Sequence, residues 1–184
     1  RRTRAMMAQE KGLVPLAELV LSQPLGVSPE EAAQAYLNDD VPTVEDALQG
    51  ARDIIAEQIS ENANVRSQTR EKALKFAILT AEKIEDAVDE KGTYRTYYEF
   101  EGRVDRLQPH QTLAIARGEK EGILRVRVKI SDRDWLPVVQ SEIKEDMISP
   151  FVDQLETAIQ DAAARLLLPS IARDVRRSLS DASE

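Results

Sequence analysis

The 184-residue sequence has no cysteine and a single histidine, His110. Without cysteine there are no disulfides and no thiolate metal ligands, and one histidine alone completes neither a zinc site nor a Cys-His catalytic pair. His110 lies at a predicted helix start, where a protonated imidazole would contact a phosphate, although a partly exposed helix-end side chain is the simpler explanation. We therefore predict no catalytic residue, no bound metal and no cofactor.

Long apolar runs are also missing. No stretch approaches the roughly 20 apolar residues of a membrane span, and no hydrophobic leader opens the sequence, so we expect a soluble cytoplasmic protein without a membrane partner. The first residue is arginine rather than methionine, and the sequence stops soon after a strong helical pattern. We expect these 184 residues to be a piece of a longer chain.

Motifs that bind phosphate or divalent cations are weak or missing. Gly118 and Gly122 lack the Gly-Lys-Ser/Thr ending of a phosphate loop, so no nucleotide site is predicted. Carboxylates at 132–134 and 142–146 would suit Mg²⁺, whose ligands usually come from several distant segments. Acidic residues beside arginine in a loop more commonly form a solvated salt-bridge surface, which is the interpretation we favour.

Helical periodicity, in contrast, is abundant. Residues 43–60 show it most clearly, with apolar residues every three or four positions and Thr43 as a good N-cap. Gly50 stands beside the apolar stripe, where a small residue would let a neighbouring helix approach closely. Arg52 and Asp53 are predicted on or beside the solvent face, making salt bridges or caps to neighbouring segments.

Weaker versions of this pattern predict helices over residues 1–10, 13–21, 28–37, 65–79, 109–118, 135–147 and 151–168, with Pro169 kinking or ending the last one before 170–179. Residues 80–91 keep a poor helical spacing. Residues 94–100 hold most of the aromatic side chains and are predicted to be a helix or an irregular arm docked by its rings.

Only residues 123–130 alternate like a strand, and a lone strand needs a partner, either nearby or outside the sequence. The predicted fold is therefore mainly α, an elongated multi-helix array with at most one or two short β-strands around residues 123–130. We expect a single helical domain over 1–184 with lobes at 1–60, 61–130 and 131–184.

Charge separates one region from the rest. The sequence has 25 basic and 33 acidic residues, a net charge of −8, yet residues 94–129 have eight cations against five anions. Such a stripe attracts phosphates, and the neighbouring rings would stack on bases. Alternatively, the cations pair with nearby glutamates and protect a strand edge. The candidate nucleic-acid-binding residues are Arg95, Arg103, Arg106, Arg117, Lys120, Arg125, Arg127 and Lys129. A further basic group, Arg173, Arg176 and Arg177, is expected to complement a helix C-terminus.

Several stretches, in order along nearly the whole sequence, resemble the Tex family of bacterial transcription accessory proteins. The most specific is Gly50-Ala51-Arg52-Asp53-Ile54-Ile55-Ala56-Glu57. The others are residues 1–4, 12–17, 35–37, 44–49, 94–98, 113–124 and 166–171. The resemblance departs at 109–111, where Pro-His-Gln stands in place of a frequent Ser-His-Arg and removes one cation.

This resemblance implies a long, mostly helical protein with a helix-turn-helix-like N-terminal part, a catalytically degenerate YqgF/RNase H-like domain, helix-hairpin-helix modules and a C-terminal OB fold that binds RNA. The present sequence would be the interior helical region before the RNase H-like domain. No catalytic motif of the family falls within it.

The leading functional hypothesis is thus a non-enzymatic helical scaffold of a Tex-like transcription protein that binds nucleic acid, RNA or possibly DNA, mainly through other parts of the chain. The alternative is a protein-interaction module that docks onto RNA polymerase or onto other domains of the same chain, without contacting nucleic acid. Exposed apolar patches along 124–130 or 151–168 would favour this alternative.

Overall fold

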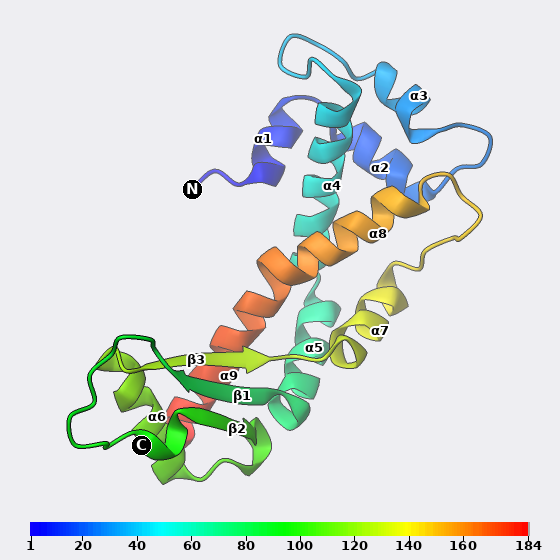
Figure 1. The fold of residues 1–184 in the computed structure, drawn as a ribbon. Coiled ribbons are helices and arrows are strands. Elements are labelled where there is room, and N and C mark those ends of the chain that lie inside the picture. The colour runs from blue at the N-terminus through cyan, green and yellow to red at the C-terminus, as the bar shows by residue number, and fades with distance from the viewer. Residues whose placement is uncertain (184) are drawn as a thin grey trace. The chain divides into compact units, whose positions relative to one another are not determined.

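A computed structural model describes residues 1–183, and its fold is mainly α, as predicted (Figure 1). The chain forms two compact units, each made of two separate stretches. Unit 1 comprises residues 1–66 and 137–168, and unit 2 comprises residues 67–136 and 169–184. Helices α5 (Ala63–Phe76) and α7 (Asp132–Glu142) each contribute to both units. We predicted three lobes, each a single continuous stretch of sequence. These two units do not test that division, which stays a prediction.

Unit 1 is built around the helix that the sequence marked most clearly. This helix, α4 (Val44–Glu61), contacts α1 (Arg4–Glu10), α2 (Val14–Ser22), α3 (Pro29–Gln34), α8 (Val152–Asp161) and the π-helical segment η3 (Ala162–Leu167). Its start is fixed as predicted, because the Thr43 hydroxyl accepts a hydrogen bond of 3.1 Å from the backbone N–H of Asp46. The Ser28 hydroxyl caps α3 in the same way.

Gly50 allows a close approach at the centre of unit 1, as its position beside the apolar stripe predicted. A Cβ atom at Gly50 would lie 2.3 Å from Cδ1 of Leu13 and 3.3 Å from Cβ of Ala8. Leu13 is itself buried and has little room to move. The missing side chain therefore lets α1 and the start of α2 lie directly against α4.

The predicted solvent-side position of Arg52 and Asp53 is wrong, because both residues are only 8% exposed. Neighbouring segments cover this side of α4 as well as its apolar side. Salt bridges do form: Arg52 pairs with Glu45 of the same helix at 2.6 Å, and Asp53 lies 3.9 Å from Arg165 of a neighbouring segment. Asp53 accepts a hydrogen bond from Gln49. These partners satisfy the charges that burial removes from water.

The helical run from residue 152 is longer than predicted. Helix α8 passes through η3 directly into α9 (Leu168–Ser183), so Pro169 does not end the helix. Proline lacks the backbone N–H of an α-helical turn, and its ring crowds the carbonyl four residues earlier. The π-helical turn immediately before Pro169 provides a wider backbone spacing at the position where that crowding would occur.

Unit 2 contains an antiparallel sheet with strand order β2-β1-β3 (Figure 1). Strand β3 (Leu124–Lys129) was predicted, and its partner within the chain is β1 (Ile78–Lys83). Strand β2 (Glu99–Arg103) completes the sheet, so the expected limit of one or two strands was too low. Both β1 and β2 occupy segments that were predicted as helical or irregular.

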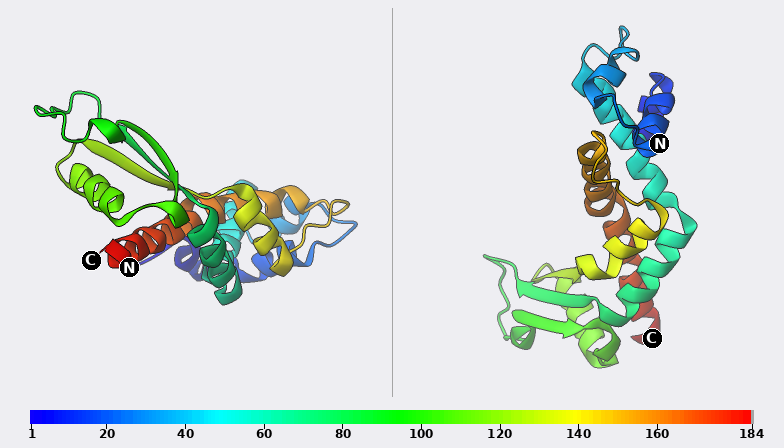
Figure 2. Two further views of the ribbon diagram at one scale, coloured as in Figure 1. Left: turned by 90° about the horizontal axis from the view of Figure 1, so that it is seen from below. Right: turned by 90° about the vertical axis from the view of Figure 1, so that its right-hand side faces the viewer.

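Helix α6 (Pro109–Lys120) packs against the face of the sheet that carries Leu124 (Figure 2). Gly118 was predicted to end this helix, but it lies inside it and is buried. A Cβ atom there would meet Leu124 at 2.5 Å and Tyr94 at 3.1 Å. The reversal into β3 instead uses Gly122, whose φ of +75° suits glycine.

The tyrosine-rich segment forms part of the packing of unit 2. Tyr94 and Tyr97 are buried, and Tyr97 lies in the short 3-10 helix η1 (Arg95–Tyr97). Asp89 organises this segment, because its carboxylate accepts from the backbone N–H groups of Thr93 and Tyr94 and from the Tyr98 hydroxyl at 2.7 Å. The hydrogen bond to Asp89 raises the pKa of Tyr98 above its ordinary value of 10.0.

Candidate nucleic-acid interface

Three of the eight predicted cations lie together on one face of β3. Leu124 is buried inside unit 2, whereas the side chains of Arg125, Arg127 and Lys129 are exposed on the opposite face of the strand. This arrangement follows from the two-residue period of a strand and was predicted from the alternation. Strand β3 is also at an edge of the sheet, so its cations border open solvent.

The neighbouring strands decide how much of that positive charge is neutralised. Arg125 stands opposite Glu82 and forms an ion pair with it at 3.3 Å. Arg127 stands opposite Thr80, and Lys129 opposite Ile78. Neither Arg127 nor Lys129 has an ion pair or side-chain hydrogen bond within residues 1–183. These two are therefore the cations of β3 that remain free for an external anion.

Strand β2 adds an acidic row to the same sheet face. Glu99 and Glu101 stand opposite Glu82 and Thr80 of the central strand and are exposed. A depression of about 360 Å³ crosses this face, lined by Thr80, Ala81, Glu82, Glu99, Phe100, Glu101, Arg127 and Lys129. The acidic row was missed because β2 itself was not predicted. The unpaired cations of this face are therefore on the β3 side, because Arg103 at the end of β2 is paired with Asp105.

Of the other five predicted cations, only Arg103 shares this sheet face, opposite Ile78, and it is already paired. Arg103 forms a two-point contact with Asp105, donates to the carbonyl of Lys75 and lies 5.5 Å from the ring centre of Phe76. Arg117 and Lys120 belong to α6, which packs on the other face of the sheet. Arg95 and Arg106 lie in separate 3-10 turns, η1 and η2 (Val104–Arg106). The eight residues are consequently not one continuous patch.

The basic residues of α9 and the single histidine do not extend the candidate interface. On α9, Arg176 forms an ion pair with Glu119, and Arg177 lies 3.4 Å from Asp174. His110 is exposed in the first turn of α6. Neither group adds to the cations of β3.

Two of the aromatic rings in residues 94–100 are buried. Tyr94 and Tyr97 are buried, and Tyr97 packs edge-on against Phe100 with ring centres 5.3 Å apart. These two rings are therefore unavailable to bases, whereas Tyr98 and Phe100 are only half-buried, and stacking on them stays a prediction. A nucleic acid on this face would meet mainly charged side chains, with Phe100 the one ring that lines the depression.

Charge differs sharply between the units. Unit 2 has 17 basic and 16 acidic residues, a net charge of +1, whereas unit 1 has 8 basic and 17 acidic residues, a net charge of −9. The overall charge of −8 therefore comes from unit 1. A polyanion would be repelled by unit 1 and tolerated by unit 2.

The carboxylates that were weighed as magnesium ligands have local partners. Asp132 accepts a 3.0 Å hydrogen bond from the indole N–H of Trp135, and Asp134 is buried at the start of α7. In unit 1, Glu142 accepts from Asn64 and Glu145 accepts from Gln140. Within residues 1–183, no group of three or more acidic or histidine side chains is arranged to hold a metal ion.

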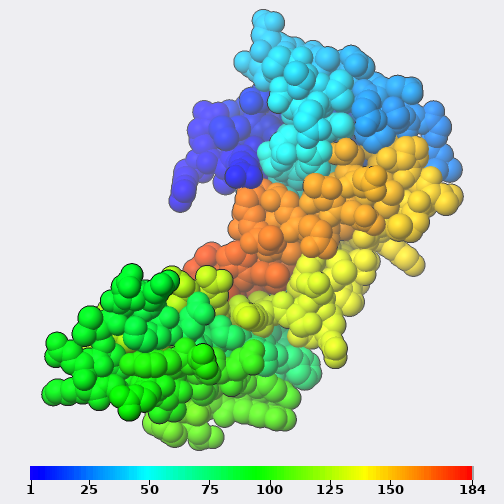
Figure 3. Space-filling view, in the orientation of Figure 1, coloured from blue at the N-terminus to red at the C-terminus, as the bar shows by residue number. Residues whose placement is uncertain are grey.

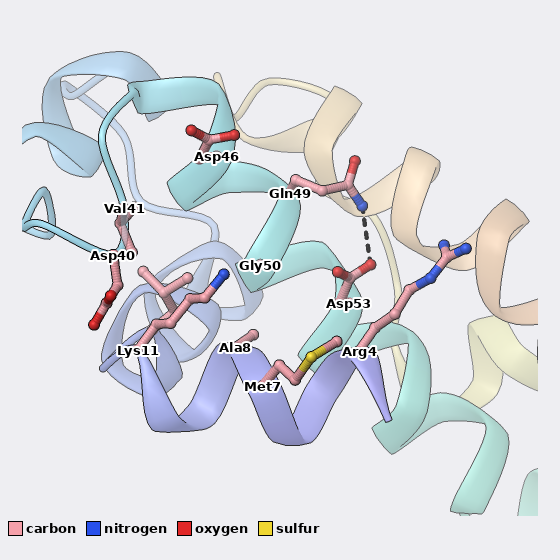
Figure 4. Close-up of a pocket in the computed structure, with 11 residues that line it drawn as sticks. Arg4, Met7, Ala8, Lys11, Asp40, Val41, Asp46, Gln49, Gly50 and Asp53 are labelled. Carbon is pink, nitrogen blue, oxygen red and sulfur yellow. Dashed lines mark hydrogen bonds between the residues drawn. The ribbon is translucent and has the colours of Figure 1, made fainter. Parts of the chain in front are cut away.

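A cavity of about 290 Å³ lies in unit 1 between α1 and α4 (Figure 4). Arg4 and Lys11 reach it from α1, and Asp46, Gln49 and Asp53 reach it from α4. With Asp40 included, its carboxylates outnumber its cations, so it is not an anion site. The hollow accompanies the close approach of α1 to Gly50, and its mixed charges do not define a ligand class.

The stretches considered as apolar docking faces are mostly internal. Leu124 is buried in unit 2, and Phe151, Leu155 and Leu167 are buried in unit 1. Large exposed patches along 124–130 or 151–168 are therefore not found in the described chain. Among residues 1–183, no helix is both long enough and apolar enough to cross a membrane.

With this geometry established, comparison with known proteins identifies the family. The family described as Tex central region-like matches residues 25–184. The chain belongs to the Tex family. Within it, this segment corresponds to the central helical region, as the sequence resemblance indicated.

Individual relatives agree with the Tex assignment. The uncharacterized protein YdcI of Bacillus subtilis is 34% identical over 187 residues, which cover 100% of this chain and 26% of YdcI. The transcriptional accessory protein Tex of Neisseria gonorrhoeae is 36% identical over 150 residues, 81% of this chain and 19% of that protein. The transcription elongation factor spt6 of Schizosaccharomyces pombe is 28% identical over 115 residues, 59% of this chain and 8% of spt6.

The chain thus spans about a quarter or less of the length of these relatives. Two of the three are named for transcription, so the Tex family is transcription-related.

Proposed function

We propose that this Tex-family segment is a non-enzymatic helical scaffold of a cytoplasmic transcription accessory protein, and that unit 2 adds a contact to the phosphates of RNA through Arg127 and Lys129. The single observation that carries the contact is the placement of both cations, exposed and without ion pairs in the described chain, on edge strand β3. The near-neutral charge of unit 2 supports it. The names of the relatives support the transcription role of the whole protein.

The spacing of the two side chains suits a phosphate backbone. Residues two apart on one face of a strand are separated by about 6.6–6.8 Å, so the two cations point the same way and can both follow one nucleic-acid backbone. Because Tyr94 and Tyr97 are buried and unavailable for stacking, the contact would be weak, salt-sensitive and indifferent to base sequence. DNA single strands of equal length would bind similarly.

Charge reversal tests the contact. The double variant Arg127→Glu/Lys129→Glu should bind a fluorescent single-stranded RNA about tenfold or more weakly at low salt, measured by anisotropy. Because each single-strand phosphate contact contributes about 0.7 to the salt slope, the slope of log Kd against log salt should fall by about 1.4.

The matched control is Arg117→Glu/Lys120→Glu, which makes the same charge change on exposed positions of α6. Its affinity should change much less. Equal losses in the two variants would show a general charge effect and refute the β3 contact. No binding by the unaltered chain at low salt would favour the alternative, in which the segment docks onto RNA polymerase or other parts of the same protein.

A further inference from the structure

Three large apolar side chains are exposed on two loops of unit 1. Leu25, after α2, is 62% exposed, while Met147 and Ile148, before α8, are 70% and 77% exposed. We call these three residues the apolar tip. No neighbouring segment of the described chain covers them, although most other large apolar residues of unit 1 are buried. Exposure of adjacent large apolar groups is costly in water and commonly marks an interaction surface.

The two loops are joined into one surface by hydrogen bonds. The Gln23 side chain donates to the carbonyl of Lys144 at 2.9 Å and accepts from the backbone N–H of Asp146 at 2.5 Å. The Ser149 hydroxyl donates to the carbonyl of Pro24 at 3.1 Å. Figure 3 shows the blue surface of the first loop adjoining the yellow-orange surface of the second. The apolar tip is therefore held in place before any partner arrives.

Gln23 both ends α2 and links the two loops. Its backbone has a φ of 49°, a left-handed conformation that a residue other than glycine adopts at a cost. This conformation ends α2, and the side chain then bridges to the second loop. The bridge makes the relative placement of Leu25 and Met147 a fixed feature of unit 1.

The two segments that carry the apolar tip are rich in carboxylates. Residues 18–31 and 140–150 contain six carboxylates and one ammonium group, Lys144. The carboxylates are Glu18, Glu30, Glu31, Glu142, Glu145 and Asp146. None of the six forms an ion pair within residues 1–183, and unit 1 has a net charge of −9. The negative charge around the tip therefore remains uncompensated.

We propose that the apolar tip is a docking site for a basic protein segment whose leucine or isoleucine side chains contact Leu25, Met147 and Ile148 while its lysines and arginines face the surrounding carboxylates. Charge complementarity selects this occupant, because an acidic protein or a nucleic acid would be repelled. The site lies in the unit that does not carry β3, so it is separate from the RNA contact proposed above.

The test uses the 184-residue chain and a short fluorescein-labelled peptide of alternating Lys/Arg and Leu/Ile residues. The triple variant Leu25→Ser/Met147→Ser/Ile148→Ser should bind this peptide about tenfold more weakly than the unaltered chain. A peptide with glutamate in place of every basic residue should not bind. Added salt should weaken the interaction, because the rim charges are exposed.

The control variant Val88→Ser/Leu113→Ser removes comparably exposed apolar groups from unit 2 and should leave peptide affinity unchanged. Amide shifts in an NMR titration of the unaltered chain should cluster at 23–26 and 144–149, which tests the site without any substitution. Equal binding by the triple variant, equal binding of the acidic peptide or shifts elsewhere would overturn the proposal. So would a dimer of the chain that the triple variant abolishes, because the occupant would then be a second copy.

Discussion

The position of Gly50 shows how one missing side chain sets the packing of unit 1. Replacing it with leucine would force new atoms into the space held by Leu13 and Ala8. Overpacking of this kind costs about 1–3 kcal/mol, and each kcal/mol lowers the Tm of a chain of this size by about 2–4 °C. We therefore predict a clear fall in Tm for Gly50→Leu, measured by circular dichroism.

The control for this substitution is Gln58→Leu, which introduces the same side chain on the same helix at an exposed position. It should leave the Tm nearly unchanged. If Gly50→Leu melts at the same temperature as the unaltered chain, the close approach of α1 to α4 does not depend on glycine.

The sequence predicted the positions of some individual side chains correctly and of others wrongly. The small residue beside an apolar stripe identified Gly50, and the capping pattern identified Thr43. Arg52 and Asp53 were misplaced because an amphipathic pattern normally implies a solvated side. In unit 1 that side is covered by segments distant in sequence, and no local pattern reveals which segments will cover it.

Among the elements, the connection between β1 and β2 depends on Asp89, whose carboxylate bonds to Thr93, Tyr94 and Tyr98. The raised pKa of Tyr98 means that folding favours its neutral phenol. That contribution is complete below the ordinary tyrosine pKa of 10.0 and is lost as pH rises through the raised value.

Ultraviolet titration of phenolate should therefore show a step above pH 10.0 that comes from Tyr98, and Tyr98→Phe should remove that step. Asp89→Asn should move the step downward, because the amide no longer provides the same charged acceptor. A Tyr98 step at or below the ordinary value in the unaltered chain would show that the hydrogen bond is absent in solution.

Helices were easier to predict than strands for a physical reason. Helix periodicity and caps are local, so α4 and α6 were found close to their true bounds. Strand β1 follows α5 almost at once and retains part of its helical spacing, while β2 contains a single large apolar residue, Phe100. Pairing with other strands makes these segments extended, and pairing depends on residues far apart in sequence.

In the candidate interface, too, local patterns could be predicted from the sequence and contacts between distant segments could not. Alternation predicted that Arg125, Arg127 and Lys129 share a face, because that follows from strand geometry alone. Arg103 was included with them, yet Asp105 and Phe76 engage it. Which cations stay free is decided by neighbours on other strands and turns, and the sequence does not show these neighbours.

For the whole molecule, the central result is that charge and candidate contacts divide between the units. Unit 1 is strongly acidic and displays the apolar tip, whereas unit 2 is nearly neutral and displays the free cations of β3. The difference in charge between the units could not be predicted from the sequence, because each unit is made of two stretches that are far apart in the sequence. On the two proposals made above, unit 1 would be the protein-facing unit of this chain and unit 2 the nucleic-acid-facing unit.

The most direct test is an NMR titration of the ¹⁵N-labelled chain with a short single-stranded RNA at low salt. Our account predicts amide shifts centred on Arg127 and Lys129 of β3 and on the adjacent Thr80, with residues of α2, α3 and α4 unaffected. These shifts should weaken as salt is added. Shifts concentrated in unit 1, or no shifts along β3 at saturating RNA, would contradict the assignment of the nucleic-acid contact to unit 2.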